Sequence, residues 1–236
     1  MELRVLGTGS SGNSYALYDR NQIVLLDAGI PARKIMCGIE HRIGDVVGCL
    51  ITHEHQDHCR GARDLSRLGV PMLGTPGTKD ALPFIDASMS KRQRRIGCFT
   101  VLDFPVSHDT KEPCGWLLFN TRTGERLLYA TDTNGLLFTF PRINYWLVEC
   151  NYTNTLLEST ALVQRERIAK THMSMETLAT VLGRNDLTEC KQIILCHMSR
   201  ERGDLQLMTS FIGSQTGKPT AMATEGARFS LNLEPF

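Results

Sequence analysis

The sequence predicts an α/β protein in which two mixed β-sheets pack face to face with helices on the outside. Apolar runs of strand length occur in clusters, and each cluster is followed by segments with helical spacing. Turns rich in Gly, Asn, Thr and Pro separate the segments, which is typical of packed layers of sheet and helix. The 236 residues can form a substantial core, and we expect a single domain over residues 1–236.

The first half of the chain is expected to alternate strands with short helices. Apolar runs bounded by Gly, Asp, Asn or Pro predict strands at Leu3–Leu6, Tyr15–Tyr18, Ile23–Leu26, Val46–Ile51 and Met72–Leu73. Helical spacing predicts helices at Ala32–Ile43, Cys59–Leu68 and Thr78–Ile85. In the first of these helices, Ile35, Ile39 and Ile43 would share one face and point to the core.

The second half repeats this alternation with longer helices. Strands are expected at Phe99–Val106, Trp116–Phe119, Arg126–Ala130, Tyr145–Val148, Gln192–Cys196, Thr220–Ala223 and Arg228–Leu233. Helices are expected at Thr155–Ala169, Met175–Leu182 and Leu205–Ile212. The sequence shows no internal repeat and no low-complexity tract, so a solenoid or an extended linker is not expected.

Composition narrows the classes of protein that the chain could represent. Lys and Arg total 26 against 25 Asp and Glu, a net charge of +1 that argues against broad non-specific binding to nucleic acid. No apolar run approaches the roughly 18 residues of a membrane span, and no signal peptide is seen. The eight cysteines form no CxxC pair, so we expect reduced thiols in a cytoplasmic protein.

A glycine-rich stretch near the N-terminus imitates a dinucleotide-binding fingerprint. Gly7–Gly12 reads GxGxxG after a strand, and Asp27 follows at the expected distance. The fingerprint also requires a helix after the third glycine, because the helix N-terminus holds the pyrophosphate. The next residues predict strand, turn and strand, so we reject this function and expect a tight turn close to a site.

The most informative stretch follows the strand Val46–Ile51. His53, His55, Asp57 and His58 form the pattern HxHxDH. Residues two apart on a strand face the same way, so the first two histidines could bind one ion, while Asp57 and His58 reach a second ion after a turn. Imidazole and carboxylate ligands suit zinc, with manganese or iron as alternatives.

Three further residues follow apolar strands elsewhere in the chain. His108 ends FPVSH, Asp132 follows LLYAT, and His197 ends IILCH. Sites usually lie where a strand gives way to a loop, so we expect these residues to join the histidine cluster in one site. By contrast, His41 and Cys59 are expected to be a surface residue and a packing residue.

Together these motifs resemble the metallo-β-lactamase superfamily over residues 1 to about 200. The resemblance implies a four-layer αββα sandwich with a dinuclear site, with Asp27 as a supporting acid beneath the metals. One ion would be held by His53, His55, His108 and Asp132. The other would be held by Asp57, His58, His197 and the same Asp132, which would bridge the two ions.

Other motifs are similar to the YycJ-type nuclease and phosphodiesterase branch and its phage-borne relatives. They are GTGSSGNSY, LLDAGI, His108–Trp116 and THMS. The function expected is therefore a phosphodiesterase that cleaves nucleic acid with metal-activated hydroxide, with a homodimer common in the superfamily. The alternatives are a phage-type phosphodiesterase for cyclic nucleotides, a thioester or other metallo-hydrolase, and a non-catalytic binding module.

Several residues outside the metal set are expected to assist catalysis or bind substrate. Asp57 would orient the hydroxide while it ligates, and His172 would donate a proton to the leaving group. Ser174 predicts the N-cap of a helix whose amides could seat a phosphate. Glu149 would support a ligand histidine. The basic run Lys91, Arg92, Arg94 and Arg95 is either a solvated face or a contact to the phosphate backbone.

Overall fold

The computed structural model describes residues 1–87 and 92–232 of the chain, which cluster into two compact units. The first unit contains the described residues up to Pro105, then Thr110–Glu125, and those from Thr224 onward. The second unit contains Val106–Asp109 and Arg126–Ala223. The expectation of a single domain over residues 1–236 stays a prediction.

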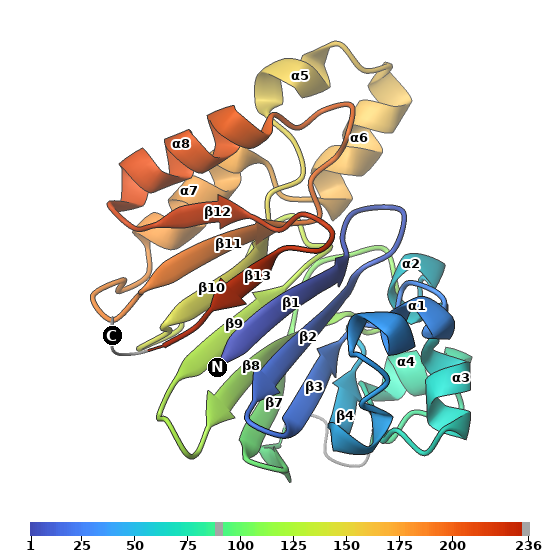
Figure 1. Cartoon of the computed structure of the whole chain (residues 1–236). Coiled ribbons are helices and arrows are strands. Elements are labelled where there is room, and N and C mark those ends of the chain that lie inside the picture. Colours follow the sequence, from blue (N-terminus) through green and yellow to red (C-terminus); the bar gives the residue numbers. More distant parts are fainter. Residues whose placement is uncertain (88–91, 233–236) are drawn as a thin grey trace. The chain divides into compact units, whose positions relative to one another are not determined.

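A six-stranded mixed sheet forms the centre of the first unit (Figure 1). Its strand order is β13-β1-β2-β3-β4-β5, with β3 and β4 parallel and the β1–β2–β3 meander antiparallel. The strands are β1 (Glu2–Gly7), β2 (Ser14–Asp19), β3 (Gln22–Leu26), β4 (Val46–Leu50), β5 (Met72–Leu73) and β13 (Arg228–Ser230). The same unit contains an antiparallel set from the second sheet, namely β6 (Arg94–Ile96), β7 (Phe99–Pro105) and β8 (Cys114–Asn120).

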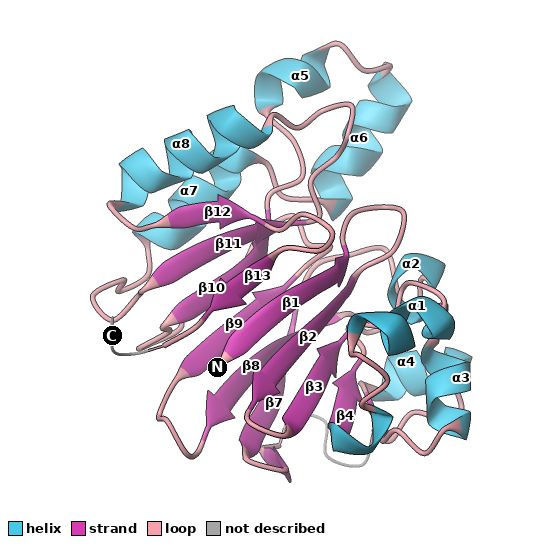
Figure 2. Cartoon of the chain, viewed as in Figure 1, coloured by secondary structure: helices cyan, strands magenta, loops and turns pink. Residues whose placement is uncertain are grey.

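Short helices pack on the six-stranded sheet through one apolar cluster (Figure 2). They are α1 (Ala32–Gly38), the 3₁₀ turn η1 (Ile43–Asp45), α2 (Gln56–Cys59) and α3 (Ala62–Arg67). The unit also contains α4 (Pro76–Ala81), and Leu82 directly after it packs against the cluster. Ile35 of α1 and Leu65 of α3 are fully buried with Leu25 of β3 and Cys49 of β4. The apolar faces of these helices therefore supply the core that the spacing of their residues predicts.

The second unit contains parallel strands in the order β12-β11-β10-β9. These are β9 (Arg126–Ala130), β10 (Tyr145–Glu149), β11 (Gln192–Cys196) and β12 (Thr220–Met222). The helices are α5 (Asn154–Glu158), α6 (Leu162–Thr171), α7 (Met175–Gly183) and α8 (Leu205–Thr216). Helices α7 and α8 pack together, and α8 packs on β12 (Figure 1). Every residue of β10 is buried, as expected for a central parallel strand.

The predicted two mixed sheets flanked by helices are confirmed, whereas several helix boundaries are wrong. The helix predicted at Ala32–Ile43 ends at Gly38, because Glu40 and His41 adopt left-handed φ angles of 56° and 59°. The helix predicted at Cys59–Leu68 spans only Ala62–Arg67, and a separate four-residue helix, Gln56–Cys59, precedes it. Asp57 and His58 therefore lie within a helix, whereas they were expected to follow a turn after the strand.

Other boundaries differ for local reasons. The helix predicted at Thr78–Ile85 spans Pro76–Ala81, because Thr75 caps it through a bond from the Thr78 amide. The segment Thr155–Ala169 is divided between α5 and α6. The strand β6 was not expected, and the last strand ends at Ser230, while Leu233 lies outside the described residues. None of the described helices is both long and apolar enough to cross a membrane.

Candidate metal centre

The first unit positions four predicted ligands on one elbow between β4 and α2. His53 follows the strand, His55 precedes the first residue of α2, and Asp57 and His58 lie in its first turn. The ring centroid of His53 lies 4.8 Å from that of His55 and 4.2 Å from that of His58. Asp57 Oδ2 lies 3.7 Å from His58 Nε2. We call residues 53–58 the histidine elbow.

The buried carboxylate of Asp27 fixes the histidine elbow by hydrogen bonds to His58 and to the adjacent Thr52. Strands β3 and β4 are parallel neighbours, so Asp27 and Thr52 come together beyond their carboxyl ends. Asp27 accepts hydrogen bonds from the Thr52 amide at 2.8 Å and from the Thr52 hydroxyl at 2.9 Å. It also accepts from His58 Nδ1 at 2.8 Å. Asp27 is fully buried, so these donors compensate the removal of its charge from water.

These hydrogen bonds determine which imidazole nitrogen is available to a metal. An ionised carboxylate only accepts hydrogen bonds, so His58 Nδ1 carries the proton and Nε2 keeps its lone pair. The Thr52 hydroxyl donates to Asp27, so it accepts from His53 Nδ1 at 3.0 Å. Both histidines therefore adopt the tautomer that binds a metal through Nε2.

The glycine-rich turn between β1 and β2 supports the same elbow. It leads directly into β2 with no helix, as the sequence predicts. The Asn13 amide donates to the Asp57 carbonyl at 2.7 Å, and Asn13 Nδ2 lies 3.1 Å from His58 Nε2. A Cβ on Gly29 would lie 1.7 Å from the Asp57 carbonyl oxygen, so the backbone approach requires glycine there.

The second unit gathers its polar residues by a different route. Asp132, Glu149 and His197 lie at or just beyond the carboxyl ends of β9, β10 and β11. Parallel strands bring such ends to one edge of a sheet. Together with His172, which follows α6, they offer ligand atoms that all lie within 4.8 Å of one another.

Glu149 is the central acceptor of this second cluster. Its Oε1 accepts from His172 Nδ1 at 2.7 Å and from His197 Nδ1 at 2.9 Å. Its Oε2 accepts from the amides of Thr133 and Met173 at 2.9 and 3.1 Å. Glu149 therefore fixes both rings through Nδ1, which in neutral His197 leaves Nε2 as the acceptor nitrogen. In His172 the same carboxylate raises the pKa, so that Nε2 can carry a second proton.

His108 belongs to the same unit. Its Nδ1 donates to the Thr171 carbonyl at 3.0 Å, which leaves Nε2 directed to Asp132, with Oδ2 at 3.6 Å. The ring of His172 lies 5.5 Å from that of His108 and 5.3 Å from that of His197. The second unit therefore contains Asp132, His108 and His197 of the predicted ligands, together with the predicted acid His172.

Burial and neighbouring charges move the pKa values of this cluster in opposite directions. Burial lowers the pKa of His108 and outweighs the attraction of Asp132. Burial alone would lower the pKa of His172, but Glu149 raises it to a net value above the usual range. Burial alone would raise the pKa of Glu149, but His172 and His197 bring it below the usual range. The carboxylate is thus stabilised in its charged form.

Backbone conformation also distinguishes the predicted site residues. Asp27, Asp132 and His197 have left-handed φ angles of 57°, 45° and 51°. Such angles strain residues other than glycine and occur most often where a structure holds a side chain for function. The strain lies in both units, directly after strands β3, β9 and β11.

The donor set fits divalent metal ions. His53, His58, His108 and His197 each have Nδ1 bonded to oxygen, so each presents the Nε2 lone pair that zinc, iron and manganese sites use. Asp57 and Asp132 add carboxylate oxygens to the two units. Neutral imidazoles and carboxylates are ligands that zinc, iron and manganese all accept, so this donor set does not distinguish among them.

The residues predicted to bind substrate are Ser174, which is a helix cap, and the basic run at 91–95. Ser174 caps α7, where its hydroxyl accepts from the Thr177 amide at 3.0 Å. In the basic run, Lys91 lies outside the described residues, Arg94 pairs with Asp86, and Arg95 donates to the Gly97 carbonyl at 3.2 Å. Arg92 is exposed near the start of β6. Two of these cations thus already have partners within the fold.

Sequence reasoning missed three polar residues that hold the predicted ligands. They are Asn13, Thr52 and Asn151, whose Nδ2 donates to the His197 carbonyl at 2.8 Å. Thr52 directly precedes the HxHxDH pattern and Asn13 directly follows GxGxxG, so adjacency to a motif was the available signal. Cys59 is buried as predicted, and its burial raises the pKa of the thiol to about 12.

Known proteins are similar to this chain over most of its length. The Beta-lactamase superfamily domain matches residues 23–198. The chain is 28% identical over 226 residues to "Exodeoxyribonuclease WalJ" of Streptococcus pneumoniae, covering 86% of this chain and 83% of that protein. It is 26% identical over 228 residues to "Exodeoxyribonuclease YycJ" of Bacillus anthracis, covering 88% and 86%. Among solved structures, the metallo-β-lactamase fold protein YhfI from Bacillus subtilis has a TM-score of 0.73 at 12% identity, covering 97% of this chain and 98% of that one.

Proposed function

The chain belongs to the β-lactamase superfamily, and on that premise we propose that it is a hydrolase that uses two divalent metal ions to cleave phosphodiester bonds in nucleic acid. The observation that carries the proposal is the shared tautomer of four histidines, each with Nδ1 bonded to oxygen. The names of the two bacterial relatives, both exodeoxyribonucleases, support the choice of substrate.

The proposed ligand sets are those that the resemblance to the superfamily implies. One ion is held by His53, His55, His108 and Asp132, and the other by Asp57, His58, His197 and Asp132. Zinc is the metal that we propose, because imidazole nitrogen predominates among the ligands.

The chemistry divides between the metals and the side chains. Bound divalent ions lower the pKa of water towards neutrality and neutralise charge on phosphate oxygens. Asp57 orients the attacking water from the histidine elbow. His172 donates a proton from Nε2 to the leaving oxygen, because its Nδ1 is held by Glu149 at 2.7 Å. Asp27 and Glu149 keep the ligand histidines in their tautomers.

Two further expectations belong to the proposal. All eight cysteines are free thiols, which supports function in the reducing cytoplasm. The homodimer remains a prediction from the resemblance. A sedimentation measurement on the purified protein tests the dimer directly.

A single panel of substrates tests the proposal. The protein is stripped with EDTA, reloaded with Zn²⁺ or Mn²⁺, and incubated with end-labelled single-stranded DNA, duplex DNA, RNA and cyclic mononucleotides. We expect metal-dependent release of nucleotides from at least one polymer. Hydrolysis of cyclic nucleotides alone would replace the proposed function by the small-substrate alternative. Failure of the folded protein to bind any divalent ion would remove the metal mechanism.

A further inference from the structure

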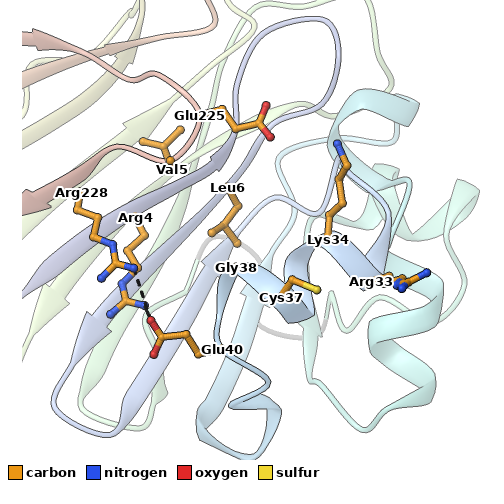
Figure 3. Close-up of a pocket in the computed structure, with 11 residues that line it drawn as sticks. Arg4, Val5, Leu6, Arg33, Lys34, Cys37, Gly38, Glu40, Glu225 and Arg228 are labelled. Atoms are coloured by element: carbon orange, nitrogen blue, oxygen red, sulfur yellow. Dashed lines mark hydrogen bonds and ion pairs between the residues drawn. The ribbon is translucent and has the colours of Figure 1, made fainter.

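A groove of about 460 Å³ lies within the first unit, between α1, β1 and the turn before β13 (Figure 3). This volume lies in the range of sites that take a small molecule or one unit of a polymer. Leu6 of β1 supplies the accessible apolar floor, because Val5 beside it is only 1% exposed, and Cys37 of α1 lines one wall. The remaining lining residues are charged, apart from two glycines, and are Arg4, Arg33, Lys34, Glu40, Glu225 and Arg228.

The walls of this groove are fixed by close packing. A Cβ on Gly38 would lie 2.6 Å from Leu6 Cδ2, so glycine allows α1 to approach β1 closely. The turn before β13 is bonded to β1 in both directions, because the Val5 amide donates to Ala227 and the Gly226 amide donates to Val5, both at 2.9 Å. The groove is therefore preformed.

The charges of the groove are unequally distributed. It contains four cations and two acids, a net charge of +2 in a chain whose total is +1. Glu40 is shared by Arg4 at 2.7 Å and Arg228 at 3.5 Å. Arg33 and Lys34 are both exposed on α1, and no ion pair to either occurs within residues 1–87 and 92–232. A positive potential at the α1 wall follows.

The segment before α1 connects this wall to the histidine elbow. The Ala28 amide donates to the His58 carbonyl at 2.8 Å, and the Gly61 amide donates to the Ala28 carbonyl at 2.7 Å. Helix α1 begins at Ala32, four residues after Ala28. The groove and the elbow thus belong to the same unit and are joined through one short, hydrogen-bonded segment.

We propose that this groove binds a nucleotide of a single-stranded nucleic acid substrate, with phosphates contacting Arg33 and Lys34 and a base resting on the floor formed by Leu6. The inference rests on the proposed function, which makes a phosphodiester chain the ligand. Stacked bases of a duplex cannot reach a concave floor, whereas the bases of a single strand can. Glu225 repels phosphate and therefore weakens binding at its side of the groove.

Binding without turnover is the first test. In EDTA, the anisotropy of a fluorescent 12-nucleotide oligo(dT) is measured against NaCl concentration. Loss of two phosphate contacts in Arg33→Gln/Lys34→Gln should reduce the slope of log K against log [salt] by about 1.4, at about 0.7 for each contact. Arg63→Gln/Lys79→Gln removes the same charge from α3 and α4, and it should retain the wild-type slope. Thermal melts confirm that both variants fold.

Two further measurements test the groove: a variant that should bind oligo(dT) more tightly, and protection of Cys37 from a maleimide by oligo(dT). Glu225→Gln removes the repelling charge, so it should tighten oligo(dT) binding by about two- to fivefold, the effect of one surface charge. Cys37 is the exposed cysteine, and the other seven are buried. Saturating oligo(dT) should therefore slow the reaction of native protein with a maleimide, and loss of this protection in Arg33→Gln/Lys34→Gln is expected.

The outcomes separate this inference from the proposed function. A wild-type protein that cleaves no nucleic acid would refute the function. A wild-type protein that cleaves single-stranded DNA would support the function. In that case, an unchanged salt slope and an unchanged KM in Arg33→Gln/Lys34→Gln would overturn the groove assignment. Poly-glutamate that protects Cys37 as well as oligo(dT) does would also overturn it, in favour of an acidic peptide.

Discussion

The two units assemble their shares of the proposed metal centre in contrasting ways. In the first unit, four ligands come from six consecutive residues, His53 to His58, on one elbow. In the second unit, His108, Asp132 and His197 come from three separate segments, and 89 positions separate the first from the last. A local cluster is visible in sequence, whereas a dispersed cluster depends on parallel strands that end at one edge.

Both units nevertheless use the same supporting device. Asp27 in the first unit and Glu149 in the second are fully buried carboxylates that accept from histidine Nδ1 and from backbone amides. Asp27 holds one ligand histidine directly, while Glu149 holds His197 and the proposed acid His172. In the proposed mechanism, one carboxylate of the second unit would therefore couple metal binding to proton transfer, and the carboxylate of the first unit would not.

The largest expected effect comes from the residue that we propose both ions share. Asp132→Ala should abolish binding of both ions and reduce turnover by about 10³-fold or more, the scale of losing a central electrostatic group. His55→Ala in the elbow should lose one ion only. Elemental analysis gives the number of ions per chain. Loss of one ion in each variant would contradict the shared role of Asp132.

The next effect isolates proton transfer in the second unit. His172→Gln should slow turnover by about 10²-fold, the usual contribution of a general acid. The metal content should stay at the wild-type value, because His172 is outside the proposed ligand sets. A substrate whose leaving group needs no proton, such as a nitrophenyl phosphodiester, should lose much less rate. Equal losses for both substrates would exclude His172 as the acid.

A matched pair of isosteric changes tests whether the two supporting carboxylates are equivalent. Asp27→Asn and Glu149→Gln should each weaken metal affinity by about 10- to 100-fold, because the ligand histidines lose their negatively charged acceptor. Glu149→Gln should also reduce the rate at saturating metal, since it holds His172, whereas Asp27→Asn should regain most of its rate. Metal titration followed by turnover provides both readouts. Equal recovery of turnover at saturating metal in the two variants would mean that the two carboxylates have equivalent roles.

The smallest expected effect concerns helix caps. Ser174→Ala in α7 and Thr75→Ala in α4 each remove a side chain that accepts from an amide of the first turn. Each should lower the free energy of unfolding by about 1 kcal/mol in urea denaturation. We also expect KM for the phosphodiester to rise in Ser174→Ala and not in Thr75→Ala. Equal KM values would limit Ser174 to capping.

Features made by residues close together in the chain could be predicted from the sequence, and features that depend on tertiary structure could not. Strands with buried apolar runs, such as β4 and β11, were predicted within one residue, because burial dominates their pattern. Helix ends were predicted poorly, because the left-handed turn at Glu40 and His41 depends on packing and not on a glycine signal. The contact of His172 with Glu149 spans 23 positions and needs the fold itself.

The groove beside α1 could not be predicted for a related reason. Its lining combines residues 4–6, 33–40 and 225–228, which become neighbours only when β13 pairs with β1. The basic run at 91–95 was the more visible candidate in sequence, yet Arg94 pairs with Asp86 in the fold. Charge clustered along a chain is therefore a weaker guide to a binding surface than charge gathered by tertiary structure.

The contact between Gly29 and the Asp57 carbonyl limits how this protein can be modified in the laboratory. Any side chain at position 29 collides with backbone, which has no alternative rotamer to adopt. Random libraries that include this position will mostly yield inactive clones, whatever the selection. Productive diversity should instead be directed to exposed positions such as Arg33 and Lys34, where altered substrate preference can arise without disturbing the catalytic scaffold.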